Sequence, residues 1–87
     1  MLARLEGNDP ALRDEVIVLG AHFDHLGSAR QPHPRRPSAP TASDSIWNGA
    51  DDNASGTAVA LAITQPLAAG GVVCPRTLLF AFFSAEE

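Results

Sequence analysis

The chain has 87 residues, a formal net charge of −4 and one cysteine, Cys74. A chain of this length buries only about 60–65% of the surface that its unfolded state exposes, which is little for an α/β enzyme that folds alone. The charge gives no support to nucleic-acid binding, one cysteine excludes an internal disulfide framework, and we find neither a signal peptide nor an apolar run long enough for a membrane span.

Two apolar segments near the start of the chain predict strands. Residues 2–7 (LARLEG) and 15–23 (EVIVLGAHF) are separated by the turn-forming stretch GNDPALRD. This arrangement predicts an antiparallel pair. The continuous apolar run from Val16 to Leu19 is typical of a strand that is buried on both faces.

The next segment, residues 28–45, has no regular pattern. It contains four prolines and shows neither the period of a strand nor that of a helix. We therefore expect a long, proline-rich surface loop within the domain.

Residues 51–71 (DDNASGTAVALAITQPLAAGG) predict a helix. Asn53 or Ser55 can cap its start, and the two glycines at 70–71 end it. Pro66 removes one backbone hydrogen bond, so we expect a kink or an early end there. Residues 76–87 (RTLLFAFFSAEE) then predict a second buried strand. Strand, helix and strand in this order predict a right-handed parallel crossover, and the fold class is α/β.

Three polar clusters lie at the ends of these predicted elements. HFDH ends the first buried strand, GADDN begins the helix and EE ends the second strand. Each cluster alone has an ordinary explanation, as a polar pair, as acids near the positive end of a helix, or as a solvated strand end. In a parallel crossover, however, all three lie at the sheet edge where ligands bind. One imidazole with several carboxylates there predicts a metal centre.

The donor types in these clusters favour zinc. Imidazole and carboxylate without thiolate suit zinc, with manganese, iron or cobalt as weaker alternatives. Neighbouring strand residues point to opposite faces, so Glu86 and Glu87 should have different roles. One of them can bind metal while the other holds an attacking water.

Three motifs, GAHFDHLG, NGADDNASG and FFSAEE, occur in this order and resemble motifs of the di-zinc metallo-exopeptidases. That family includes secreted aminopeptidases, glutamate carboxypeptidase-like enzymes and glutaminyl cyclases. The resemblance implies a three-layer α/β/α domain with a mixed, mainly parallel sheet. Residues 1–87 would be the amino-terminal portion of this catalytic domain, with the loop at 28–45 inside it.

The resemblance also implies the metal ligands. His22 and Glu87 would each bind zinc, and Asp52 would bridge the two zinc ions of a complete domain, often next to a cis peptide bond to Asn53. The family has a further Asp and a further His downstream of these motifs, and this sequence does not contain them. We therefore expect the chain to be a truncated, inactive part of the domain, with exposed apolar strands and low solubility.

Catalytic roles follow from the same resemblance. Glu86 would be the general base, Asp24 would orient the imidazole of His22, and His25 would make structural hydrogen bonds. The first hypothesis for the function is a zinc aminopeptidase that acts on peptides. The alternatives are a carboxypeptidase or glutaminyl cyclase of the same family, or a non-catalytic binding or structural relative. The family suggests a secreted or periplasmic location, and the sequence does not fix an oligomeric state.

Overall fold

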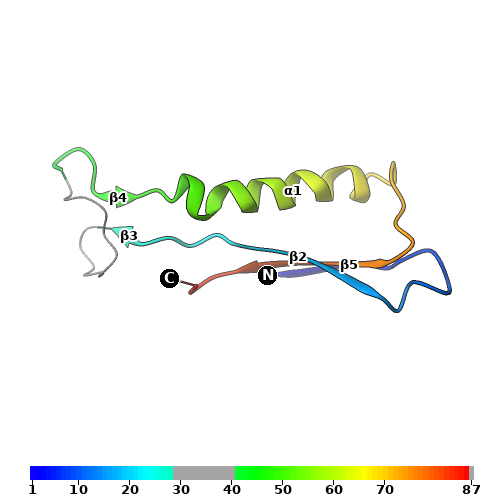
Figure 1. Cartoon of the computed structure of the whole chain (residues 1–87). Helices are drawn as coiled ribbons and strands as arrows, with labels where there is room; N and C mark the ends of the chain where they lie inside the picture. Colours follow the sequence, from blue (N-terminus) through cyan, green and yellow to red (C-terminus); the bar gives the residue numbers. More distant parts are fainter. Residues whose placement is uncertain (29–40, 87) are drawn as a thin grey trace.

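The computed structural model describes residues 1–28 and 41–86, which form one three-stranded sheet, one helix and a two-stranded ladder (Figure 1). The elements are β1 (Leu2–Leu5), β2 (Val16–His22), β3 (Gly27–Ser28), β4 (Ile46–Trp47), α1 (Ser55–Ala68) and β5 (Thr77–Phe83). Most of the predicted loop at 28–45 lies outside the described residues, and so does Glu87. Within the two described ranges, no helix has the length and apolar character needed to span a membrane.

The sheet has the strand order β1-β5-β2. Strand β5 runs parallel to β2, with Ile17 opposite Leu78, and antiparallel to β1, with Leu2 opposite Ala81. The predicted parallel crossover β2-α1-β5 is confirmed, and the fold is α/β with a mixed sheet. The predicted pairing of the first two strands with each other is wrong, because β5 lies between them. The ten-residue connection from Glu6 to Glu15 is long enough to pass over the end of β5.

The burial predicted for β2 is also wrong. Val16 and Val18 expose 54% and 59% of their surface, whereas Phe80 at the centre of β5 exposes only 3%. Both strands read as continuous apolar runs, and a strand of this kind is buried only where neighbours cover it. Strand β5 has a neighbour on both sides, whereas β2 is an edge strand within the described part of the chain.

Helix α1 is shorter than the sequence predicts, because residues 50–54 form an irregular turn before it. The side chain of Asn53 accepts a hydrogen bond from the backbone N–H of Gly56 at 3.0 Å, so Asn53 provides the expected cap. The helix continues two residues beyond Pro66 and ends at Ala68. Its end is closed by Gly70, whose φ of 72° favours glycine.

The apolar core lies between α1 and one face of the sheet. Ala60 and Leu67 of the helix pack against alternate residues of β5, namely Leu78, Phe80 and Phe82. Apart from the five-residue π-helical turn η1 (Ala50–Ala54), α1 is the one helix among the described residues, and it covers this one face (Figure 1). The α/β class is therefore shown, and the second helical layer of a three-layer domain stays a prediction.

Candidate metal and catalytic site

The carboxyl ends of β2 and β5 meet at one edge of the sheet. His22 is the last residue of β2 and lies opposite Phe83, the last residue of β5. The hydroxyl of Thr57, in the first turn of α1, donates a hydrogen bond to the carbonyl of His22 at 2.9 Å. The start of the helix is thereby fixed beside the end of β2, as the parallel crossover requires.

A second set of contacts joins the motifs GAHFDHLG and NGADDNASG. Strands β3 and β4 pair antiparallel, with Gly27 opposite Trp47. Gly49 has a φ of 61°, and a Cβ atom at this position would lie 2.5 Å from the Cβ of His25. Only glycine fits such a close approach. The motif around His22 and the turn that carries Asp52 are therefore packed directly against each other.

Asp52 lies in the irregular turn formed by residues 50–54. Neither Asp52 nor Asn53 has helical backbone angles, and the peptide bond between them is cis. The family resemblance implied a cis bond at this place, and the structure has it. The turn brings Oδ1 of Asp52 to 3.1 Å from Nε2 of His22, a residue 30 positions away in the sequence.

The ring of His22 contacts oxygen atoms on both sides. Its Nδ1 lies 2.9 Å from the backbone carbonyl of Asp24. A carbonyl only accepts hydrogen bonds, so we assign the proton to Nδ1. Nε2 then faces Asp52, with Oε2 of Glu86 at 4.0 Å. A neutral ring would direct a lone pair at these carboxylates, so the arrangement requires either a second ring proton or a metal ion.

These contacts determine the pKa of His22. Burial of the ring lowers the pKa, but the hydrogen bond to the Asp24 carbonyl and the negative charges of Glu86 and Asp52 together raise it above its ordinary value of 6.5. In the absence of metal, the ring is therefore protonated more readily than a free imidazole. A cation at this position has a favourable electrostatic environment.

Asp24 links the ends of the two parallel strands. One of its carboxylate oxygens accepts a hydrogen bond from the backbone N–H of Glu86 at 3.0 Å, and the other lies 3.7 Å from Nδ1 of His22. Ala85, just before Glu86, has a φ of 65°, which is uncommon for a residue with a side chain. The chain therefore turns sharply after β5, and this turn directs Glu86 toward His22.

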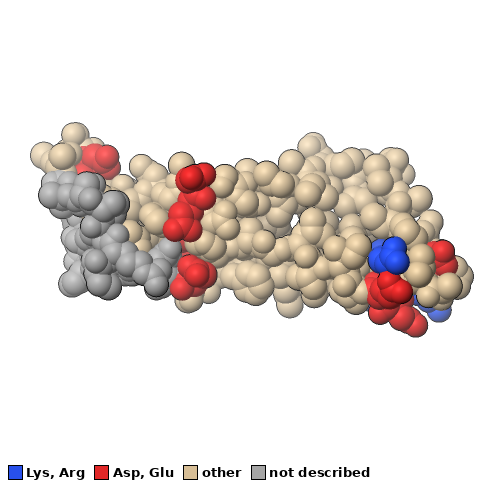
Figure 2. Space-filling view, in the orientation of Figure 1, with Lys and Arg blue, Asp and Glu red and all other residues tan. Residues whose placement is uncertain are grey.

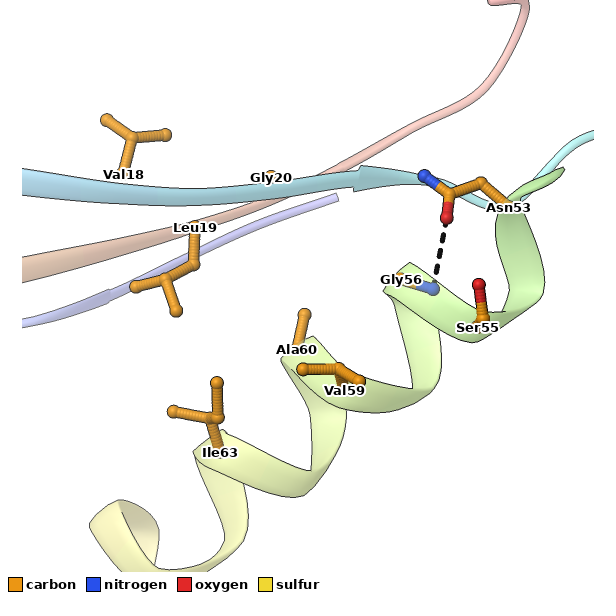
Figure 3. A pocket seen from close by; sticks show the side chains of 9 residues that line it. All are labelled: Val18, Leu19, Gly20, Asn53, Ser55, Gly56, Val59, Ala60 and Ile63. Carbon is orange, nitrogen blue, oxygen red and sulfur yellow. Dashed lines mark hydrogen bonds between the residues drawn. The ribbon is translucent and has the colours of Figure 1, made fainter. Parts of the chain in front are cut away.

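His22, Asp24, Asp52 and Glu86 surround a space outside the carboxyl ends of β2 and β5, hereafter the crevice. The crevice is acidic. Figure 2 shows acidic side chains between the start of α1 and the end of β5, where Asp51, Asp52 and Glu86 are exposed. Arg13 and Arg76 lie at the opposite ends of the strands. An open groove of about 540 Å³ lies between β2 and α1, with Asn53 at one end and apolar side chains along it (Figure 3).

Two predicted metal ligands, His22 and Asp52, lie together with donor atoms of the types that zinc prefers. Glu87, the third, is outside the described residues. Within residues 1–28 and 41–86 no group of three or more His, Cys, Asp or Glu side chains is placed to hold a metal ion. The described part thus fits a zinc site without completing one.

The model of Peptidase family M28 matches residues 1–87, the whole chain. The chain belongs to this family. No curated protein and no solved structure matched. The M28 peptidases are zinc metallopeptidases, so the predicted family and the general function, zinc-dependent hydrolysis of peptides, are supported.

Within this M28 peptidase, the structure adds contacts that the motifs alone did not reveal. Asp24 holds the His22 ring mainly through its backbone carbonyl, and its carboxylate binds the backbone of Glu86. Thr57 and Gly49 position the site without being ligands. Gly49 at the start of the motif NGADDNASG was a signal in the sequence, because a left-handed turn there favours glycine.

Proposed function

We propose that the complete domain to which this chain contributes is a zinc aminopeptidase. The observation that carries the proposal is the convergence of three motif residues that are distant in sequence. Nε2 of His22 lies 3.1 Å from Asp52 and 4.0 Å from Glu86. An imidazole nitrogen that faces two carboxylates is an arrangement suited to a metal ion with an adjacent base.

In this proposal His22, Asp52 and Glu87 contribute to a centre of two zinc ions. When bound, the zinc ions would supply Lewis acidity, which polarises the scissile carbonyl and acidifies water. Asp24 keeps Nε2 of His22 free for metal, because its carbonyl holds the proton on Nδ1. Asp51 has no contact with the ring of His22 and is assigned no role.

Glu86 is the proposed general base. Its carboxylate is half exposed and faces the crevice, so it can accept a proton from the attacking water. It then delivers this proton to the amine that leaves when the peptide bond breaks. The hydrogen bond from the backbone N–H of Glu86 to the carboxylate of Asp24 fixes the position of the Glu86 backbone.

The side chains of the crevice support an aminopeptidase over a carboxypeptidase. The described residues of the crevice are His22 and the carboxylates of Asp24, Asp52 and Glu86, and they include no lysine or arginine that could bind the free carboxylate of a carboxypeptidase substrate. Bound zinc would offset the charge of the carboxylates, so the preference rests on the type of these side chains and not on their net charge. We further propose that the 87-residue chain is inactive alone, because His22, Asp52 and Glu87 supply only part of two metal sites.

The proposal is tested by exchanging each of the two adjacent glutamates in the complete domain. Glu86→Gln should keep the zinc content and lower kcat by a factor on the order of 10²–10⁴, the usual effect of losing a general base. Glu87→Ala should instead lower the zinc affinity, with partial recovery of activity at high zinc. Elemental analysis and hydrolysis of an aminoacyl anilide measure the two quantities.

Asp51→Asn is the matched control, because Asp51 is a neighbouring exposed carboxylate without contact to His22. It should leave both zinc content and kcat close to wild type. Full activity of Glu86→Gln would refute the proposed mechanism. Equal loss of zinc in both glutamate variants would refute the division of roles between them.

A further inference from the structure

The backbone carbonyl of His22 is bound by a side chain and not by a neighbouring strand. The N–H of the next residue, Phe23, donates to the carbonyl of Phe83. Hydrogen bonding alternates along a parallel ladder, so the carbonyl of His22 points away from β5. There it accepts the hydrogen bond of 2.9 Å from the hydroxyl of Thr57, a half-buried residue. The backbone of the proposed zinc ligand His22 is thus tied to the first turn of α1.

The same turn of α1 is joined to the irregular turn that carries Asp52. The side chain of Asn53, the next residue, accepts the hydrogen bond of 3.0 Å from the N–H of Gly56 (Figure 3). A Cβ atom at Gly56 would overlap with the amide of Asn53, so the cap and the start of the helix fit closely together. A displacement of Thr57 would therefore displace Asp52 with it.

The direct contact between His22 and Asp52 is too weak to hold the two side chains together. Nε2 of His22 lies 3.1 Å from Oδ1 of Asp52, but 64% of the Asp52 side chain is exposed. An ion pair that is this open to water contributes little to stability. Backbone contacts therefore set the separation of the two residues in the metal-free protein. Thr57 provides one of these contacts, and the packing of Gly49 against His25 provides another.

We propose that Thr57 is a positioning residue of the zinc centre, and that its hydroxyl raises the zinc affinity by holding His22 and Asp52 together before zinc binds. This inference rests on the proposed function, in which His22 and Asp52 are zinc ligands. Ligands that are already in place lose less conformational freedom on binding, so a preorganised site binds more tightly. The hydroxyl contacts the backbone of His22 and not its ring. It should therefore affect zinc binding more than the chemical step.

Zinc titration of the complete domain against a competing chelator tests this role. Thr57→Val keeps the shape of the side chain and removes the hydrogen-bond donor. We expect it to lower the zinc affinity by about 10–100-fold, the usual effect of losing a group that orients a metal ligand. Thr57→Ser restores the hydroxyl and should bind zinc nearly as tightly as the wild type. At saturating zinc, kcat should stay close to wild type in both variants.

Two controls separate the positioning role from a general loss of stability. Thr64→Val is the same substitution later in α1, where the hydroxyl bonds to the carbonyl of Leu61. Thr77→Val removes a buried hydroxyl at the amino end of β5, whereas His22 lies beside the carboxyl end of that strand. Both control variants should keep the wild-type zinc affinity under conditions in which the domain is folded.

His22→Ala distinguishes a failure of this inference from a failure of the proposed function. Loss of zinc in His22→Ala with wild-type zinc affinity in Thr57→Val would overturn the role of Thr57 and leave the zinc site in place. Wild-type zinc affinity in His22→Ala would overturn both. The role of Thr57 would also be wrong if Thr57→Ser bound zinc as weakly as Thr57→Val, or if either control variant lost as much zinc affinity as Thr57→Val.

Discussion

His22 is held between a backbone carbonyl and two carboxylates, and its titration reports this environment. Burial of the ring is outweighed by the Asp24 carbonyl and the charges of Glu86 and Asp52, so the pKa lies above 6.5 in the metal-free protein. The protonated ring therefore stabilises the metal-free fold below about pH 6.5. This stabilisation is lost as the pH rises through the raised pKa.

The pKa of His22 can be measured by NMR titration of its ring protons. Glu86→Gln should lower this pKa, because one of the raising charges is removed, and Asp51→Asn should leave it unchanged. Zinc requires the neutral imidazole, so zinc affinity should fall as the pH drops below the raised pKa. A His22 pKa below 6.5 in the wild type would contradict the described contacts.

Thr77 joins the amino ends of the strands through a buried hydroxyl. Only 1% of Thr77 is exposed. Its Oγ1 accepts a hydrogen bond from the N–H of Gly7 at 3.0 Å and donates one to the carbonyl of Arg13 at 2.6 Å. Thr77→Val keeps the shape but leaves both groups without this partner, and each unsatisfied buried group costs about 1–3 kcal/mol.

We therefore expect Thr77→Val to lower the free energy of unfolding of the complete domain by about 2 kcal/mol or more, measured by urea denaturation. Thr64→Val is the control. Thr64 is half-buried, but its hydroxyl bonds to the carbonyl of Leu61 within α1 at a place open to solvent, so this change should cost less than about 0.5 kcal/mol. Equal costs for the two variants would mean that the Thr77 hydroxyl contributes nothing specific.

The turn before α1 places Asp52, and Gly49 makes this turn possible. A Cβ at Gly49 would lie 2.5 Å from the Cβ of His25 and 2.7 Å from the carbonyl oxygen of Asp52. Gly49→Ala should therefore displace the turn and lower zinc affinity as well as stability. Gly70→Ala is the control, because Gly70 also has a positive φ but has no atom within 4 Å of the added Cβ.

Gly70→Ala should cost about 1–2 kcal/mol from the left-handed backbone alone and leave zinc affinity unchanged. Gly49→Ala should cost more than this. Urea denaturation and zinc titration of the complete domain separate the two effects. If both variants bind zinc like the wild type, packing against His25 has no role in placing Asp52.

The crossover of β2, α1 and β5 could be predicted from the sequence, whereas the strand order could not. Residues of β2 and β5 form similar apolar runs, and such runs show that a strand is apolar without showing which neighbours it has. Long-range pairing decided that β5 is central and that Val16 and Val18 are exposed. The helix start agrees with the predicted cap at Asn53, whereas Asp51 and Asp52, which resemble acids of a first helical turn, lie in the irregular turn before it.

The placement of the site residues could be predicted more completely than the order of the strands in the sheet. In a parallel crossover the ends of β2 and β5 and the start of α1 lie at the same edge of the sheet. The topology alone therefore predicted that His22, Asp52 and Glu86 lie near one another. What the sequence could not indicate is the part played by backbone atoms, such as the carbonyl of Asp24 that holds the ring of His22. Backbone contacts leave no pattern of residue types.

In the described chain as a whole, fewer large apolar side chains are buried than exposed. Its buried apolar residues are the three alanines Ala21, Ala60 and Ala81 and five larger residues, Leu26, Leu67, Leu78, Phe80 and Phe82. Exposed large apolar residues include Val16, Val18, Val59, Leu61 and Phe83. A single helix on one face of a three-stranded sheet cannot cover all of these. The face of the sheet that points away from α1 is open within the described chain.

We therefore expect the 87-residue chain, when kept monomeric by dilution and free of zinc, to be loosely packed. It should keep its far-UV circular dichroism, bind a hydrophobic dye and unfold without a sharp transition, because secondary structure persists where specific packing is weak. The complete domain should bind little dye, since its additional chain would cover the exposed strands. Dye fluorescence and thermal unfolding measure both properties. A single cooperative transition in the monomeric, zinc-free chain would show that contacts around Leu78, Phe80 and Phe82 alone suffice for a stable fold.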